Sequence, residues 1–321
     1  MFISRSLTKI TRIRLFIMKP KFETTVAAAL PAFPFKRPFG AEPPREFAIL
    51  RKILPISKVG IVDNTAWAWL LTKHNDICQV LDDNEHFSKC RTLPNFPELT
   101  KGGRLAAAHK PTFVDMDPPE HTTSRGMVGP GFTIDSVKKM APLIQHVADD
   151  SLNKMLSSPN SSADLVASFA LPMASQIMYL ILGIPLADMP QLSTYNAIRT
   201  NGSSTATQAS IANKELLDYL TSLVEKKANA QQHERDLITT LVTEQLKPGK
   251  IQLDDLVQVV FLVLVAGNAT MVSMIALGVV TFLQHPLQLA AVRANPTLMN
   301  NAVKELCRFH TASALASRKY S

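Results

Sequence analysis

Leu256 to Gln284 reads LVQVVFLVLVAGNATMVSMIALGVVTFLQ, a run of residues without a charged side chain. Gly267 costs a helix interior about 1 kcal/mol relative to alanine, and a buried Asn268 needs a hydrogen-bond partner. Placing both inside an apolar helix predicts a backbone opened to a ligand. Thr270 follows Ala266 by four positions, so its hydroxyl shares a face with small side chains. The competing interpretation is a small-residue notch where another helix crosses closely.

The same run is long enough to be a membrane helix. Gln258 and Asn268 interrupt it, and Asp254 and Asp255 precede it directly. These polar residues favour a fully buried central helix of a globular domain. We therefore expect no membrane span, and a membrane-anchored, non-enzymatic protein remains the alternative from a different functional class.

The net charge of +8 on 321 residues is concentrated near the start of the chain. Residues 1–22 carry six basic side chains and no acid, which leaves +2 on the rest. That remainder is too small for a nucleic-acid footprint, so we expect no nucleic-acid partner. Residues 1–30 form a basic leader that resembles a mitochondrial transit peptide. A disordered tail and a start at Met18 remain open.

The three cysteines, Cys78, Cys90 and Cys307, form no CxxC pair and no disulfide framework. A reducing compartment follows, and we expect mitochondrial or cytoplasmic localisation. The chain has no GxSxG, Walker, GxGxxG or HExxH sequence. Its eight histidines are scattered, so we expect no metal bound by protein side chains alone.

Periodicity predicts a mainly α chain with a small β element. Residues 31–44 are rich in proline and read as a linker or wrapping segment, and 58–71 reads as a hairpin. Pro172 predicts a kink or break within its helix. The predicted helices are 74–83, 119–128, 134–157, 164–182, 209–228, 234–246, 253–284, 286–293 and 297–309.

Two polar motifs flank the apolar run. In Asp115-Met-Asp-Pro-Pro-Glu-His121-Thr-Thr-Ser-Arg125, the prolines and acids suit a helix start. His121 and Arg125 then share one helix face and suit a carboxylate or phosphate of a ligand. A solvated helix end is the alternative. Glu305 and Arg308 form an i, i+3 pair, which alone carries little information.

The order of these three features resembles the cytochrome P-450 haem-thiolate family. More narrowly, four segments resemble its fungal nitric oxide reductase branch: PTFVDMDPPEH at 111–121, NAIRTNGSST at 196–205, LVAGNATM at 264–271 and HTASALA at 310–316. The resemblance covers about residues 30 to 316. It implies a cytochrome P-450 fold with haem b as cofactor.

The family usually has an acid just before the groove threonine, and this chain has Ala269 there. The loss of that acid argues against oxygen-splitting monooxygenation, and the smaller side chain widens the pocket. In the nitric oxide reductase branch NADH occupies this room. The resemblance implies that NADH reduces two nitric oxide molecules to nitrous oxide directly, with no dedicated redox partner. A conventional monooxygenase of the same family is the alternative.

The resemblance also assigns residues. His121 and Arg125 would hold haem propionates, and Ala266 and Gly267 would contact the haem. Thr270 and Ser313 would be catalytic, relaying protons and touching the nicotinamide. The charged cluster at the NADH entrance would be Arg91, Glu98, Asp115, Arg199 and Arg318. The branch has Lys then Arg at 318–319, whereas this chain has Arg318-Lys319.

In this family a cysteine within Phe-x-x-Gly-x-x-x-Cys, downstream of the Glu-x-x-Arg motif, holds the iron. The 321 residues contain no such sequence. The expectation is a fragment in which residues 31–321 are the N-terminal and central part of the domain, without the cysteine loop and last helix. We also expect an unpaired hairpin edge and exposed apolar surface on the long helix.

Overall fold

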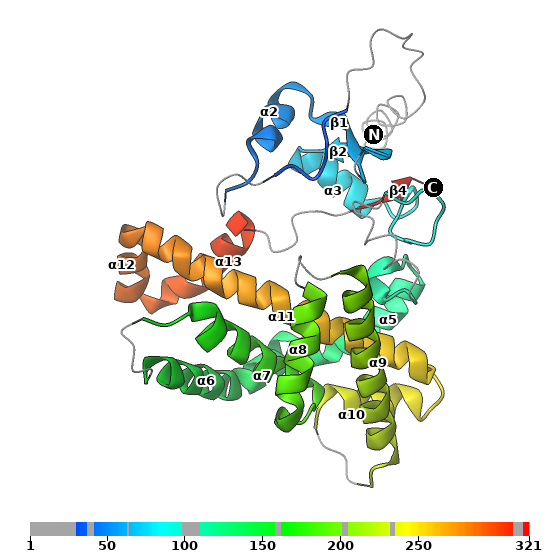
Figure 1. Ribbon diagram of the computed structural model, residues 1–321, viewed down its shortest axis with the longest axis vertical. Helices are drawn as coiled ribbons and strands as arrows, with labels where there is room; N and C mark the ends of the chain where they lie inside the picture. The colour runs from blue at the N-terminus through cyan, green and yellow to red at the C-terminus, as the bar shows by residue number, and fades with distance from the viewer. Residues whose placement is uncertain are drawn as a thin grey trace, which may run out of the picture.

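The computed structural model is mainly helical, with short strands near both ends of its described part (Figure 1). It describes residues 30–36, 42–62, 64–97, 110–157, 162–200, 205–231, 235–310 and 317–320, with backbone alone at 199, 200 and 206. The predicted fold class, mainly α with a small β element, is confirmed. The predicted leader lies almost wholly outside the described residues.

A hairpin and one helix form the N-terminal unit. Strands β1 (Ile56–Ile61) and β2 (Ala66–Leu71) pair antiparallel, which confirms the predicted hairpin. Among the described residues β2 pairs only with β1. Phe33, Phe35 and Phe47 cover one face of the hairpin, with ring centroids 5.2 to 6.3 Å apart. The proline-rich stretch therefore contributes to a small core instead of acting only as a linker.

Phe47 belongs to α2 (Arg45–Ile53), a helix that the sequence did not predict. It begins directly after Pro44, with Glu46 in its first turn and Arg51 and Lys52 in its last. These charges complement the helix dipole. A helix this short gains most of its stability from tertiary packing, here that of Phe47 on Phe33 and Phe35.

A second, two-residue ladder joins distant parts of the chain. Helix α3 (His74–Asp82) leads to β3 (Phe87–Ser88), which pairs antiparallel with β4 (Lys319–Tyr320). The Tyr320 ring stacks on His86 and meets the edge of Phe87. Figure 1 shows β4, in red, beside the cyan segment near β3. The pairing brings residue 318 next to residues 89–91.

The other elements form a helical body through which α11 runs (Figure 1). In chain order they are η1 (Phe113–Asp115), α5 (Glu120–Val128), η2 (Gly129–Phe132), α6 (Ile134–Leu156), η3 (Val166–Ala170), α7 (Leu171–Leu182), η4 (Leu186–Asp188), α8 (Met189–Thr200), α9 (Ala206–Asn229), α10 (Leu237–Leu241), η5 (Val242–Leu246), α11 (Leu253–Gln284), α12 (Pro286–Ala294), η6 (Pro296–Leu298) and α13 (Met299–His310).

The main core lies where α7, α9 and α10 meet the first half of α11. Leu182, Leu220, Ile238 and Leu256 are fully buried there. Most predicted helices are confirmed within a few residues. The interruption expected at Pro172 takes the form of a π-helical turn, η3, directly before α7. The sequence did not predict α8, because its polar residues hide the apolar period.

Helix α11 is only partly buried, which differs from the predicted fully buried helix and confirms the expected exposed apolar surface. Leu256, Val260 and Leu264 are buried in its first half, whereas Met271 and Leu283 in its second half are 49% and 69% exposed. The helix is long and apolar enough to cross a membrane, although core helices of soluble proteins pass the same test. One side of its second half is therefore an uncovered apolar surface.

Candidate functional site

The Ala266–Thr270 segment of α11 is continuous α-helix, so the predicted opening of the backbone is wrong. The helix keeps its hydrogen-bond ladder because Asn268 finds a partner on another helix instead of disrupting its own. The Thr270 hydroxyl donates to the Ala266 carbonyl at 2.6 Å. Both Ala266 and Thr270 are exposed. They form an open face made of a small side chain and one hydroxyl.

Gly267 and Asn268 lie against α7. A Cβ built on Gly267 would lie 2.3 Å from Sδ of Met178, so any larger residue would require the Met178 side chain to move. Asn268 Nδ2 donates to Ser175 Oγ at 2.9 Å. The prediction that Gly267 shares the ligand-facing surface with Ala266 and Thr270 is therefore corrected, because its small size serves helix packing.

His121 and Arg125 lie one turn apart on α5, as the i, i+4 spacing predicts. His121 is half-buried, with its ring 6.5 Å from that of Phe113 in an edge-on arrangement. Arg125 is exposed, and no hydrogen bond or ion pair joins it to the described part of the chain. The pair thus offers an imidazole held by packing and a guanidinium free to bind an anionic group.

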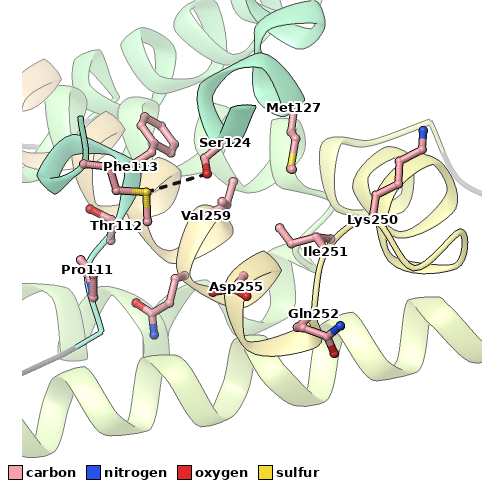
Figure 2. Close-up of a pocket in the computed structure, with 12 residues that line it drawn as sticks. Pro111, Thr112, Phe113, Ser124, Met127, Lys250, Ile251, Gln252, Asp255 and Val259 are labelled. Atoms are coloured by element: carbon pink, nitrogen blue, oxygen red, sulfur yellow. Dashed lines mark hydrogen bonds between the residues drawn. The ribbon is translucent and has the colours of Figure 1, made fainter. Parts of the chain in front are cut away.

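A cavity of about 250 Å³ shows how α5 lies against α11 (Figure 2). Ser124 and Met127 from α5 face it, as do Asp255 and Val259 from α11. The Ser124 hydroxyl donates to the Met116 sulfur across a loop that also lines the cavity. Its full lining is Pro111, Thr112, Phe113, Met116, Ser124, Met127, Lys250, Ile251, Gln252, Asp255, Gln258 and Val259.

The cavity is lined by neighbours of the two motifs, and not by His121, Arg125, Ala266 or Thr270. Val259 and Ala266 are seven residues apart, so they share a helix face about 10 Å apart along the axis. Ser124, which lines the cavity, is the residue before Arg125. On α11 the cavity therefore lies about two turns before Ala266 and Thr270.

A second group of predicted residues gathers at the β3–β4 ladder. Arg91 lies with Nη1 3.7 Å from Oδ1 of Asp115. Arg318 enters from β4, and its Nε is buried without a hydrogen-bond partner among the described residues. A buried donor without a partner loses about 1–3 kcal/mol, so it favours an acceptor from outside the chain.

Lys89 belongs to the same cluster and was missed in the sequence. Its pKa is lowered, first by burial and then by Arg318, against the attraction of Asp115 and with a smaller contribution from Arg91. The signal that could have found it is its place two residues before Arg91 in an extended segment, where alternate side chains share a side. Lys89 thus lies near Arg91, Arg318 and Asp115, and its backbone N–H donates to a second carboxylate, that of Asp117.

Asp117 fixes this cluster to the α5 region. Its carboxylate accepts from the backbone N–H of Lys89 at 2.8 Å and from the Ser88 hydroxyl. Asp115 is held by its own turn, accepting from the Thr112 hydroxyl at 3.1 Å. The sequence motif therefore has two tasks, because Asp115 faces the cations while Asp117 anchors the end of β3.

Three predicted site residues are not placed. Glu98 and Ser313 lie outside the described residues, and Arg199 is described only as a backbone position in α8. Glu305 and Arg308 form a bidentate ion pair on α13 at 2.6 and 2.7 Å, and this pair lowers the pKa of Glu305 and raises that of Arg308. Both side chains are more than half exposed, at 60% and 69%.

The cysteines lie apart from the Ala266–Thr270 face in sequence and element. Cys78 lies on α3 beside His74, Cys90 is 3.0 Å from the Thr92 hydroxyl, and Cys307 is exposed on α13. Within the described residues no group of three His, Cys, Asp or Glu side chains is placed to hold a metal ion.

Comparisons with known proteins identify the family of the chain. No protein-family model matches the chain. The chain is 50% identical over 298 residues to Cytochrome P450 55A3 of Fusarium lichenicola, covering 92% of this chain and 71% of that protein. It is 35% identical to Pentalenic acid synthase of Streptomyces avermitilis, covering 89% and 69%.

The fold is shared with solved cytochrome P450 structures. CYP105N1 from Streptomyces coelicolor superposes with a TM-score of 0.80 at 33% identity, covering 90% of this chain and 72% of that one. The chain thus spans about 70% of the length of such relatives. On the identity, the coverage and the shared fold, the chain belongs to the cytochrome P450 family.

Proposed function

We propose that this chain is of the NADH-dependent nitric oxide reductase type within the cytochrome P450 family. Its four matching segments and its 50% identity to a Fusarium cytochrome P450 support this type. The reaction takes two nitric oxide molecules, one hydride from NADH and one proton, and yields nitrous oxide, water and oxidised NAD. No separate electron-transfer protein is needed.

The observation that carries the proposal is the cation cluster. Lys89 and Arg91 follow β3, Arg318 directly precedes β4, and Arg318 brings a buried Nε without a described partner. Arginine binds phosphate with a planar fork, which suits the pyrophosphate of a dinucleotide. An enzyme that receives electrons from a partner protein has no use for a dinucleotide site of its own.

The described residues fit the flat face and acidic edge of a haem. Ala266 and Thr270 leave an open face on α11, and Arg125 has no described partner for its guanidinium. His121 and Arg125 would hold the propionates. When bound, the haem would supply the redox centre for nitric oxide.

The cysteines do not fit the iron. None of the three stands in a Phe-x-x-Gly-x-x-x-Cys sequence, and none lies on α11 or α5. We therefore propose that this chain by itself holds no thiolate-ligated haem, and its NADH site is the part that can be tested directly.

Thr270 is the chain's own group for proton transfer. Its hydroxyl donates to the Ala266 carbonyl, which leaves the Oγ1 lone pairs open to accept a hydrogen bond from a proton-carrying water. Ala269 places no carboxylate beside it. A hydroxyl without a neighbouring acid suits delivery of a single proton better than the repeated protonation that oxygen cleavage requires.

The test measures the binding of NADH to the full chain, with the fluorescence of the nicotinamide as the signal. Arg318→Gln and Lys89→Gln should each weaken binding by about tenfold, since each removes one charged contact to phosphate. Lys319→Gln is the matched control, because it removes a charge from the neighbouring β4 residue outside the cluster. Equal affinity in all three variants would remove the basis of the proposal.

A monooxygenase is the second candidate, and relatives such as Pentalenic acid synthase keep it open. Absence of NADH binding by the unmodified chain, together with haem binding, would favour it.

A further inference from the structure

The buried amide of Asn268 has one partner, and that partner comes from another helix. Asn268 is 2% exposed and Ser175 is 1% exposed, and Nδ2 of the asparagine lies 2.9 Å from Oγ of the serine. They are 93 positions apart in the sequence. Leaving such an amide unpaired in a core is expensive, so this contact strongly favours one arrangement of α7 against α11.

Beside this hydrogen bond, a close packing contact also restricts how α7 and α11 can approach each other. Met178 is 8% exposed and packs onto Gly267, where an added Cβ would come within 2.3 Å of its sulfur and 2.8 Å of its methyl carbon. Ser175 and Met178 are one turn apart on α7, and Gly267 and Asn268 are adjacent on α11. A directional bond and a close approach therefore act at the same crossing.

The way α7 crosses α11 also determines which side of α11 remains open. Successive residues of an α-helix are rotated by about 100°. With Gly267 and Asn268 held against α7, Ala266 lies about 150° and Thr270 about 110° from the direction midway between them. Both Ala266 and Thr270 are exposed.

Apolar packing alone would set this rotation poorly. Apolar side chains occur all around α11. Some of them are exposed, such as Met271, Val279 and Val280, and others are buried, such as Val260 and Leu264. A helix with this composition can bury several of its faces at similar free energy. One buried polar side chain that must meet one partner removes that ambiguity.

We propose that Asn268 and Ser175, aided by the Gly267–Met178 contact, form a rotational lock that positions Thr270. Asn268 and Ser175 are buried, so they act as positioning residues. The catalytic part of this inference rests on the proposed function, whereas the lock itself is a property of the chain.

The test measures thiol reactivity along α11. In a background with Cys78, Cys90 and Cys307 replaced by serine, one reporter is Thr270→Cys at an exposed site and the other is Leu264→Cys at a site 4% exposed. The measured quantity is the ratio of their labelling rates. Asn268→Leu and Ser175→Ala should each raise labelling at position 264 relative to 270 by about tenfold, because the helix then samples other rotations.

Two further variants separate positioning from general loss of stability. The exchange Ser175→Asn with Asn268→Ser restores a hydrogen-bonding pair and should return the ratio toward that of the unmodified chain. Thr281→Ala removes the contact of Thr281 with His310, 2.6 Å long, at the other end of the same helix. It should leave the ratio unchanged.

Three results would overturn the lock: an unchanged ratio in both Asn268→Leu and Ser175→Ala, an equal shift in Thr281→Ala, or no recovery in the exchange. If Asn268→Leu does not fold, the labelling ratio of Ser175→Ala alone tests the lock, because this variant removes a single oxygen atom and should still fold.

A final arm separates the lock from the proposed function. Metal-free protoporphyrin IX should slow labelling of Thr270→Cys in the locked chain, and this protection should fall in Ser175→Ala. If the porphyrin gives no protection in the locked chain while the labelling ratio responds as expected, the haem face is wrong and the lock stands. If the porphyrin protects but the ratio never responds, the lock is wrong and the haem face stands.

Discussion

The surroundings of Lys89 disfavour its charged form: burial, and then the nearby Arg318, lower the pKa of its ammonium group. The ammonium therefore loses its proton at a lower pH than an exposed lysine does. A bound phosphate favours the charged form, so NADH affinity should fall as the pH rises through the pKa of Lys89. Arginine stays protonated throughout this range.

We expect Lys89→Arg to flatten the alkaline loss of NADH affinity. The measurement is the NADH dissociation constant at several pH values between about 7 and 10, below and up to the ordinary lysine range. Lys319→Arg, outside the cluster, should keep the pH dependence of the unmodified chain. If NADH affinity still falls with rising pH in Lys89→Arg, a group other than Lys89 causes the pH dependence.

Asp236 sits at a different kind of charged site, one that stabilises the fold. Its carboxylate accepts from Lys227 Nζ at 2.7 Å and from the Thr239 backbone and hydroxyl at 2.9 and 2.8 Å. The same carboxylate fills the space that a side chain at Gly183 would need, and Gly183 has φ +71°. Three elements, α7, α9 and α10, therefore depend on one buried carboxylate.

Lys227→Met should lower the free energy of unfolding by about 3 kcal/mol, because it leaves a buried carboxylate without its cation. Urea unfolding followed by circular dichroism gives the value. The control is Lys214→Met, which removes an exposed ion pair with Asp218 and should leave the midpoint unchanged. A loss as small as that of the control would show that the buried bridge contributes little.

At the scale of elements, most helices were predictable, including the nine-residue α3, α5 and α12, whereas α2 and α8 were not. Helix α11 was predicted at its observed bounds, since its composition leaves little choice. Helix α2 depends on packing of Phe47 on a hairpin, and α8 has a mixed surface, so neither has a strong local signal.

The candidate site shows the same limit. The i, i+4 pair on α5 follows from spacing alone. The side of α11 on which Gly267 lies depends on Met178, and the role of Lys89 depends on β4, both of them distant in sequence. Local patterns can specify which residues share a helix face, but not which neighbour that face meets.

Asp117 connects two elements, and its loss should act through position. Asp117→Ala removes the acceptor for the Lys89 N–H and the Ser88 hydroxyl while keeping every cation of the cluster. We expect NADH affinity to fall by about tenfold, because the backbone at Lys89 is then no longer held by a charge-assisted hydrogen bond.

Asp117→Asn keeps one oxygen acceptor and should retain more affinity than Asp117→Ala. If the alanine variant binds NADH more tightly, the lost negative charge outweighs the lost anchoring, and the positional role is wrong.

For the whole molecule, the uncovered apolar surface matters most. Met271, Val279, Val280 and Leu283 on α11 and Leu287 on α12 are between 37% and 83% exposed. Contiguous apolar surface of this kind promotes association. Leu283→Gln should reduce association at rising protein concentration, measured by sedimentation velocity.

Leu156→Gln is the control, since Leu156 is 75% exposed on α6, outside this surface. An equal effect of both variants would point to general solubility instead of a specific surface.

The carbon-monoxide difference spectrum of the haem-treated chain addresses the iron ligand. The described surroundings of Cys78 and Cys90 engage their sulfurs with His74 and Thr92, and Cys307 is exposed on α13. We expect no thiolate-type band. Such a band would show that one of the three cysteines reaches the iron.

The ladder between β3 and β4 has a consequence for the order in which this protein matures. Ser88 pairs with Lys319, so two segments 231 positions apart must meet before Arg318 reaches Lys89. Closing so large a loop is entropically unfavourable and late. If the cation cluster binds NADH, affinity for the dinucleotide should therefore develop after the helical body has formed.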